Sequence, residues 1–240
     1  MKLVVGGSTG FVGTELVRQA LDNPAITSII GLGRRETPVP AGSQDGAGKL
    51  KSVVCDDFTA YPDSLKTELE GADACIWTIA VTPSKILQKT VLWEETVKVC
   101  RDYTVAALEA VSTASNKDGP LRFIYISGHF APRAGDIVPE TLTEFGLQDV
   151  ARMRGQLETQ ILDFADQSNG NVQSLIAKSG MIHGPGMEVR SVPGLPNIEL
   201  EEIAAALLDQ VINGFEKDTL SNDDMVRIGK GALNKRPADR

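Results

Sequence analysis

The stretch that decides the fold is Met1 to Gly13, which reads MKLVVGGSTGFVG. Three apolar residues, Leu3 to Val5, lead into a turn whose glycines Gly7, Gly10 and Gly13 stand three positions apart, and a helical pattern follows. Glycine has no Cβ, so the chain can turn sharply and come close to a ligand. A helix N-terminus offers unpaired N–H groups to a phosphate. With a strand before it and a helix after it, the stretch predicts a dinucleotide site in preference to a purely structural turn.

Strand-like and helix-like patterns alternate along the rest of the chain. Further strands are predicted from apolar or β-branched runs at residues 26–32, 53–54, 74–80, 123–126 and 172–177. The longer helical patterns between and after them span residues 83–114, 150–164 and 199–213. This alternation predicts an α/β fold, a doubly wound Rossmann-type parallel sheet with helices on both faces. We expect one domain over residues 1–240, in which 184–240 form a small C-terminal appendage with a short edge strand near 225–228.

The composition excludes several classes of function. The chain has 240 residues and a net charge of −8, whereas nucleic-acid binding needs clustered Lys and Arg. No window approaches the ~20 apolar residues that span a bilayer, and the apolar run after Lys2 is too short for a signal peptide. Cys55, Cys75 and Cys100 form no C-x-x-C pair, and no cluster has the spacing of metal ligands. We therefore expect a cytoplasmic protein with reduced thiols, without a metal and without a nucleic-acid or membrane partner.

The glycine spacing, G-x-x-G-x-x-G, resembles that of the short-chain dehydrogenase/reductase superfamily. The segment GGSTGFVG is similar to the atypical, NAD(P)H-binding or NmrA-like branch, and the order of later motifs carries the resemblance over roughly residues 1–185. The resemblance implies that the cofactor is contacted by the turn residues Gly7, Thr9, Gly10, Phe11, Val12 and Gly13.

The same resemblance implies cofactor contacts from three later segments. Asp56 and Asp57 follow the third strand, where the superfamily places an acid on the adenine amino group; an aspartate that caps a turn is the alternative. Ala80 belongs to the end of the fourth strand, along which relatives lay the adenine ribose and the nicotinamide side. Ser179 belongs to residues 178–185, which resemble the segment that closes over the nicotinamide.

The end of the second strand bears on the choice of cofactor. An NAD enzyme carries an acidic residue about 20 positions beyond the glycine motif to bind the ribose 2′-hydroxyl. Here Arg34 and Arg35 stand in that region, followed by Glu36. A guanidinium binds a phosphate in bidentate fashion and accepts no hydrogen bond from a hydroxyl. The pair favours NADP over NAD, with Arg34 the better candidate, although two solvent-facing arginines are the alternative.

The usual catalytic signature of the superfamily is altered. Most members carry a Ser after the fifth strand and a Tyr-x-x-x-Lys on the next helix, and Ser127 is in the expected place. Register with the family's Lys-Gly-x-x-Glu puts Arg154 at the Lys position and Val150 at the Tyr position. Valine has no proton to give, and arginine stays protonated at any working pH, so it can bind ribose or phosphate but not act as an acid. His129, two residues past Ser127, is the candidate replacement for proton transfer; a loop histidine without that role is the alternative.

These features leave three hypotheses open. The first is an NADP(H)-dependent oxidoreductase acting on a small organic carbonyl or enone, in which Ser127 polarises the substrate oxygen and His129 or a water delivers the proton. The second is a non-catalytic NADP(H)-binding redox sensor or regulatory protein, as in NmrA-like relatives. The third is a cofactor-independent isomerase or cyclase that uses His129 or His183. We expect a small-molecule substrate under residues 130–148 and 184–197, and we leave a homodimer open.

Overall fold

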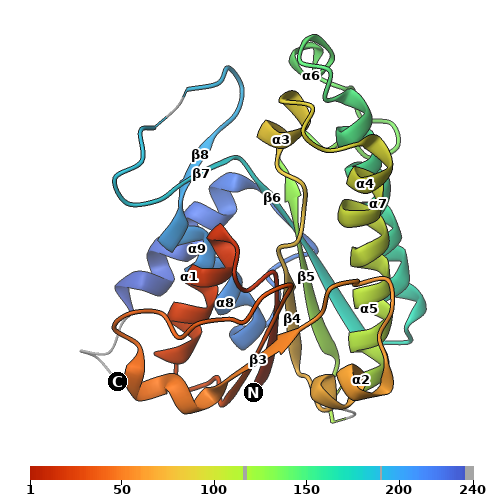
Figure 1. Ribbon diagram of the computed structural model, residues 1–240. Coiled ribbons are helices and arrows are strands. Elements are labelled where there is room, and N and C mark those ends of the chain that lie inside the picture. Colours follow the sequence, from red (N-terminus) through yellow and green to blue (C-terminus); the bar gives the residue numbers. More distant parts are fainter. Residues whose placement is uncertain (116–117, 190, 236–240) are drawn as a thin grey trace.

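The computed structural model describes residues 1–115, 118–189 and 191–235. Its centre is a parallel sheet of seven strands in the order β3-β2-β1-β4-β5-β6-β9 (Figure 1). The strands of this sheet are β1 (Lys2–Gly6), β2 (Ser28–Gly33), β3 (Leu50–Val54), β4 (Ala74–Trp77), β5 (Leu121–Gly128), β6 (Val172–Ser179) and β9 (Thr219–Leu220). A separate parallel pair joins β7 (Met181–His183) to β8 (Asn197–Glu199). The predicted doubly wound Rossmann fold is thus confirmed.

Helices cover both faces of the sheet. One face carries α1 (Phe11–Leu21), α8 (Leu200–Asn213) and α9 (Asn222–Asn234), and the other carries α2 (Asp63–Leu69), α5 (Tyr103–Ala114) and α7 (Gln148–Gln167) (Figure 1). The shorter helical segments are η1 (Gln44–Lys49), α3 (Pro83–Leu87), α4 (Trp93–Val97), η2 (Lys98–Asp102) and α6 (Glu140–Glu144). Because α8 packs on α1 and β9 extends the main sheet, the C-terminal elements share the core of the fold.

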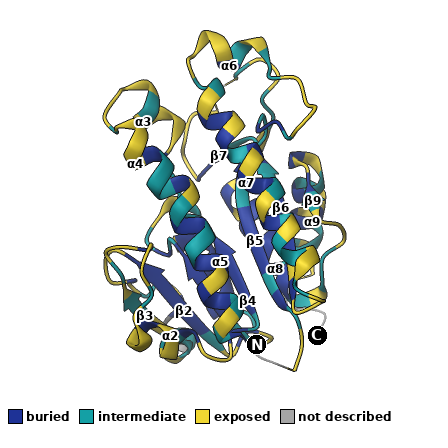
Figure 2. Ribbon diagram, turned by 90° about the vertical axis from the view of Figure 1, so that its right-hand side faces the viewer, coloured by how far each residue is buried: buried dark blue, intermediate teal, exposed yellow. Residues whose placement is uncertain are grey.

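The central strands are buried on both faces, as Figure 2 shows. Along β5, Phe123 and Tyr125 pack toward α5 and α7, while Ile124 packs toward α1 and α8. A strand that is covered on both sides has no polar face, so its sequence is a nearly continuous run of apolar residues. This explains why the parallel strands are visible in the sequence. None of the helices in the described ranges has the length and apolar character needed to cross a membrane.

The prediction of a single long helix over residues 83–114 is wrong, because the structure divides this region into several helical segments. The chain leaves the helix after α3, where Lys89 takes a left-handed conformation with φ of 53° and the Thr90 N–H donates to the Lys85 carbonyl. It resumes at α4 and passes through η2, a π-helical turn, into α5. Such π-turns are rare inside α-helices and are frequent near functional sites.

The edge strand predicted near residues 225–228 is also wrong, since this stretch lies within α9 and the edge strand is β9. A capping box sets the start of α9: the Ser221 side chain accepts from the Asp224 N–H, and the Asp224 carboxylate accepts from the Ser221 N–H. Met225 and Ile228, three residues apart, then bury the same face of the helix in the core. The capping pattern is the signal that identifies the helix.

We predict that Asp224→Asn weakens the fold at neutral pH but not in acid. Partial burial by itself raises the pKa of Asp224. Hydrogen bonding from Lys217 and Ser221 outweighs this effect and lowers the pKa from its ordinary 3.8 to about 2. A carboxyl group whose pKa is lower in the folded than in the unfolded protein stabilises the fold. This stabilisation is complete at pH values above the ordinary pKa, and it is lost as the pH falls toward the pKa of the folded state. Urea unfolding should show a loss of about 1 kcal/mol at pH 7 that shrinks in acid. Asp223→Asn, at an exposed first-turn acid, is the control; an equal loss in both variants would contradict the assignment.

Candidate functional site

The glycine turn joins β1 to α1 in a conformation that only glycine permits without strain. Gly7 has φ of +84°, and its N–H donates to the Leu32 carbonyl at 2.8 Å, while the Gly10 N–H donates to the Gly7 carbonyl at 2.8 Å. A Cβ added to Gly13 would lie 2.1 Å from the Gly7 carbonyl oxygen. Helix α1 therefore packs directly on the backbone of the turn, and no larger residue fits at this contact.

The N-terminus of α1 is open to a ligand. Its N-cap is Gly10, which has no side chain to accept from the first-turn N–H groups, and no acidic residue stands in the first turn. Gly10 and Phe11 are exposed, and Thr9 and Val12 are partly so. The Phe11 ring packs against Gly184, where an added Cβ would lie 3.0 Å from ring atoms. Unpaired N–H groups at the positive end of an 11-residue helix fit the pyrophosphate of a dinucleotide.

The two arginines after β2 are exposed side by side. Arg34 and Arg35 form no ion pair or side-chain hydrogen bond within the part of the chain that the structure describes. Their segment is tied back to the glycine turn by a buried hydrogen bond of 2.6 Å between the Ser8 and Thr37 hydroxyl groups. The sequence does not predict this hydrogen bond, because two hydroxyl groups 29 positions apart form no local pattern.

The two aspartates after β3 have different surroundings. The Asp57 carboxylate accepts from the Thr59 N–H at 3.0 Å and from the Thr59 hydroxyl at 2.7 Å, and it pairs with Lys98 at 3.1 Å. These donors lower the pKa of Asp57 to about 2. Asp56 is exposed and makes no hydrogen bond within the described residues. Both line a depression of about 390 Å³ beside α2. Asp57 has the turn-capping arrangement, so Asp56 is the candidate for the adenine.

The Ser127 hydroxyl is bound to a buried carboxylate. It donates to Glu158 of α7 at 2.5 Å, and both side chains are buried. The second Glu158 oxygen accepts from Arg133 Nε at 2.8 Å and from Lys178 Nζ at 3.2 Å. Arg133 also reaches Thr219 of β9 at 2.9 Å. A fully buried carboxylate needs such donors, and this cluster ties α7 to β5, β6 and β9.

Arg154 lies one turn before Glu158 on α7 and faces the ends of two strands. Its Nη2 donates to the Val81 carbonyl, just past β4, at 3.2 Å. Its Nη1 is 3.6 Å from the place that a Cβ on Gly128, the last residue of β5, would occupy. Val150, one turn earlier, is buried, so the position expected of the tyrosine offers no proton donor.

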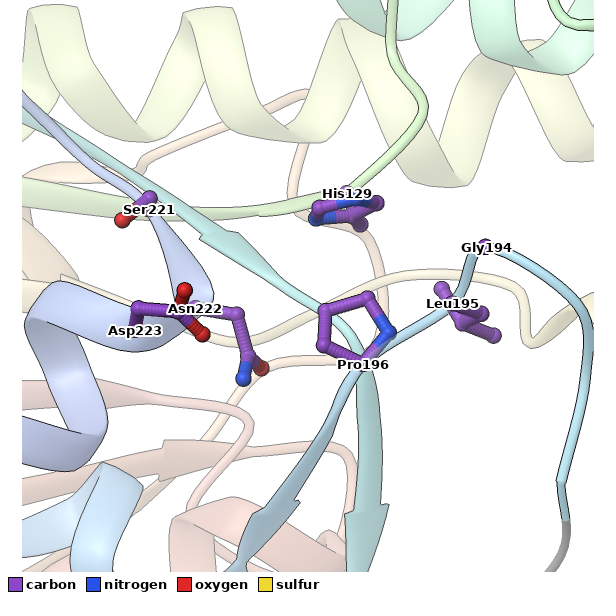
Figure 3. Close-up of a pocket in the computed structure, with 7 residues that line it drawn as sticks. All are labelled: His129, Gly194, Leu195, Pro196, Ser221, Asn222 and Asp223. Carbon is purple, nitrogen blue, oxygen red and sulfur yellow. The ribbon is translucent and has the colours of Figure 1, made fainter.

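His129 faces a different space from Arg154. It lines a pocket of about 440 Å³ together with residues 194–196 and the start of α9 (Figure 3). Burial and the nearby Lys178 ammonium group lower the pKa of His129, against the opposing effect of Asp223, another pocket residue. Within the described residues no hydrogen bond joins the His129 ring to Ser127 or Arg154. The three catalytic candidates thus lie near one end of the sheet but form no hydrogen-bonded triad.

The other predicted residues lie at the same edge. Ser179 ends β6; its carbonyl accepts from the His129 N–H at 2.8 Å, and its hydroxyl donates to the Ser127 carbonyl at 3.4 Å. Ala80 is partly buried in the segment between β4 and α3. His183 is buried in β7, with its Nε2 2.7 Å from Asn197 Oδ1, and so does not face the pocket of His129. Across the described ranges, no three His, Cys, Asp or Glu side chains gather closely enough to hold a metal ion.

Sequence comparison gives one partial match. No family model matches the chain. A curated relative, Protein FMP52, mitochondrial, from Candida albicans, is 33% identical over 85 residues. The match covers 35% of this chain and 35% of the relative, so it spans about a third of the relative's length.

Structure comparison is far more extensive. The short-chain dehydrogenase/reductase YIR035C from Saccharomyces cerevisiae aligns with a TM-score of 0.67 at 14% identity, over 93% of this chain and 96% of that one. The likeness shows that this chain has a Rossmann-type α/β fold. Gre2 from Candida albicans, solved with NADPH, aligns with a TM-score of 0.63 at 14% identity over 92% and 77% of the two chains. MoeE5, solved with UDP-glucuronic acid and NAD, aligns with a TM-score of 0.64 at 16% identity, over 98% of this chain and 83% of that one. The sheet edge that carries the candidate residues thus belongs to a Rossmann-type fold.

We predict that Gly13→Ala abolishes dinucleotide binding and costs about 1–3 kcal/mol in the free energy of unfolding, because its Cβ would overlap the Gly7 carbonyl. Gly48→Ala is the matched control, since no atom lies within 4 Å of the Cβ it would add. NADPH fluorescence titration and urea unfolding measure the two effects. Undiminished NADPH binding by a folded Gly13→Ala protein would show that the turn is not the phosphate site.

Proposed function

We propose that this protein is an NADP(H)-binding oxidoreductase of the short-chain reductase type that acts on a small organic carbonyl or enone. The observation that carries the proposal is the uncapped N-terminus of α1 behind a glycine turn, with Arg34 and Arg35 exposed at the end of the neighbouring strand and without an ion pair among the described residues. Fold relatives solved with NADPH and with NAD support a nicotinamide dinucleotide in general. The arginines favour the phosphorylated form, because a guanidinium matches a phosphate in charge and shape.

The cofactor-binding role falls to residues around the glycine turn and at the strand ends. The first-turn N–H groups of α1 would bind the pyrophosphate, Arg34 the 2′-phosphate, and Asp56 the adenine. Ser179 ends β6 and Ala80 follows β4, at the sheet edge where the nicotinamide side of the cofactor would lie. A bound nicotinamide supplies a hydride acceptor or donor; the chain supplies orientation, charge and a proton.

The proton is assigned to His129 in this proposal. The His129 ring lines the pocket of about 440 Å³. Its lowered pKa keeps the ring neutral at pH 7, so that the ring holds the transferred proton only transiently. Residues 194–196 belong to the segment expected to cover the substrate, and they line the same pocket. Ser127 contributes by holding the strand end in place through Glu158.

A second candidate function is an NmrA-like protein that binds NADP(H) without turning it over. Two observations favour it: buried Val150 at the position of the missing tyrosine, and the Ser127 hydroxyl bound to Glu158. Under this alternative NADPH binds, yet no carbonyl or enone is reduced at any pH.

The cytoplasm is the compartment that we propose. The thiols of Cys55, Cys75 and Cys100 are unpaired, as in reduced compartments. The curated relative carries "mitochondrial" in its name, so cell fractionation has to separate the two compartments. A homodimer is part of the same proposal, and sedimentation tests it.

We predict that NADPH binds more tightly than NADH and that Arg34→Asp reverses this preference. The substitution removes the partner of the 2′-phosphate and places a carboxylate, which can accept from a ribose hydroxyl, at the end of β2. The loss of these charged hydrogen bonds should raise the Kd for NADPH about 10- to 100-fold. Arg152→Asp, at an exposed arginine of α7, should leave both affinities unchanged. An unchanged preference in Arg34→Asp would reject the 2′-phosphate assignment.

We predict that NADPH oxidation against a carbonyl and enone panel rises as pH falls, with an inflection below the ordinary imidazole value of 6.5. The protonated imidazole donates the proton, and a lowered pKa makes this form appear only at more acidic pH. His129→Asn should remove the inflection. Asp223→Asn should move it to lower pH, because Asp223 favours the charged ring. A profile that is identical in all three proteins would exclude His129 as the proton donor.

A further inference from the structure

Large apolar side chains are exposed at one edge of the sheet. The described part of the chain exposes nine of them, and each lies at or beyond the carboxyl end of a strand. They are Phe11 after β1, Val54 at the end of β3, Leu87, Leu92 and Trp93 after β4, Ile137 and Phe145 after β5, and Met187 and Val189 after β6. Single exposed apolar residues are ordinary, whereas their gathering at one place is typical of a binding surface.

Two of the nine belong to the proposed cofactor site, because Phe11 opens α1 and Val54 lines the depression beside Asp56. The other seven form what we call the apolar rim. They are carried by residues 83–97, 129–147 and 184–196. Figure 1 shows α3, α6 and the connection between β7 and β8 at the top of the view, beyond the same ends of the strands. The rim thus surrounds the edge where parallel sheets bind their ligands.

The rim continues into the pocket of His129. Gly194 and Leu195, at the end of the segment that carries Met187, line this pocket. The Phe130 ring lies beside both: its centroid is 5.0 Å from that of the His129 ring, and its nearest atom is 3.6 Å from the place that a Cβ on Gly194 would occupy. A ligand that extends out of the pocket therefore meets apolar surface.

The charges of the same three segments do not favour a membrane as the partner of the rim. Six acidic residues stand on them beside four Lys or Arg residues, whereas anionic lipid surfaces attract clusters of cations. A protein seated on the rim, a second copy of this chain included, would lie across the edge at which cofactor and substrate have to enter. A small apolar ligand meets neither objection.

We propose that the substrate is a carbonyl compound with a long apolar part, such as an aliphatic ketone, whose carbonyl group lies beside His129 and whose hydrocarbon part lies against the apolar rim. The inference rests on the proposed reductase function and adds the substrate class to it. Each methylene group that leaves water for the rim favours binding, so affinity follows the length of the hydrocarbon part.

The first test uses Trp93, a member of the rim, as the probe. The chain has two tryptophans, of which Trp77 is fully buried and Trp93 is 51% exposed, so acrylamide quenches Trp93 selectively. Adding 2-decanone to the protein saturated with NADP⁺ should shift the emission to the blue and reduce the quenching. The same concentration of 2-butanone should change neither, and Trp93→Phe should abolish the response to 2-decanone. Undiminished quenching with 2-decanone would overturn the inference.

The second test measures the affinity of 2-alkanones from four to ten carbons by calorimetry, again with NADP⁺ bound. Affinity should rise about twofold to fourfold for each added methylene. Leu92→Asp and Ile137→Asp, at side chains that are 74% and 90% exposed, should flatten this rise without unfolding the protein. Thr113→Asp, at an exposed site near the far end of α5, should retain it. An affinity that does not depend on chain length, or a rise that is equal in all variants, would contradict the proposal.

Two other occupants of the rim would be detected by the same probe. Protection of Trp93 by anionic vesicles in the absence of ketone would indicate a membrane surface. Protection that grows with protein concentration, together with a dimer in sedimentation, would indicate a second copy of the chain. Either result would overturn the assignment of the rim to a substrate.

NADPH binding is measured separately, so that the two proposals can fail separately. If the wild-type protein does not bind NADPH, the proposed function fails. If NADPH binds but the length of the ketone has no effect on its affinity, only the substrate class fails.

Discussion

The close packing of α1 on the end of β1 is the constraint on which the rest of the structure depends. The Gly13 position lies so near the Gly7 carbonyl that a Cβ would reach within 2.1 Å of it. This contact places the helix N-terminus at the carboxyl edge of the sheet, with its first N–H groups uncapped by any side chain. The neighbouring strand β2 ends at the same edge and is followed by Arg34 and Arg35, which form no ion pair with any residue that the structure describes. Backbone packing, more than any single polar side chain, thus prepares this edge for an anionic ligand.

The same edge holds two charged side chains of α7 that have different partners. Glu158 is fully buried and accepts from Ser127, Arg133 and Lys178, so its charge is compensated and it links α7 to the sheet. Arg154, one turn earlier, has the Val81 carbonyl as its backbone acceptor and no carboxylate partner in the described chain. The compensated charge of Glu158 therefore serves the packing of α7 on the sheet.

The sequence predicts most of the fold and less of the site. Parallel strands covered on both faces are continuous apolar runs, so their order along the chain is visible without the structure. Long-range side-chain pairs are not: Ser127 and Glu158 lie 31 positions apart, and nothing local shows that they bond. The pocket of His129 is lined in part by the start of α9, and the sequence predicts an edge strand within this helix. The Ser221–Asp224 capping box was the available signal for that helix.

The central claim is that the α1 N-terminus and the glycine turn hold the pyrophosphate of a nicotinamide dinucleotide. A crystal structure of the protein grown with NADPH tests it most directly. We expect pyrophosphate oxygens within hydrogen-bonding distance of the first-turn N–H groups of α1, and a 2′-phosphate beside Arg34. Electron density for NADPH at any other place, or none at saturating concentration, would contradict it.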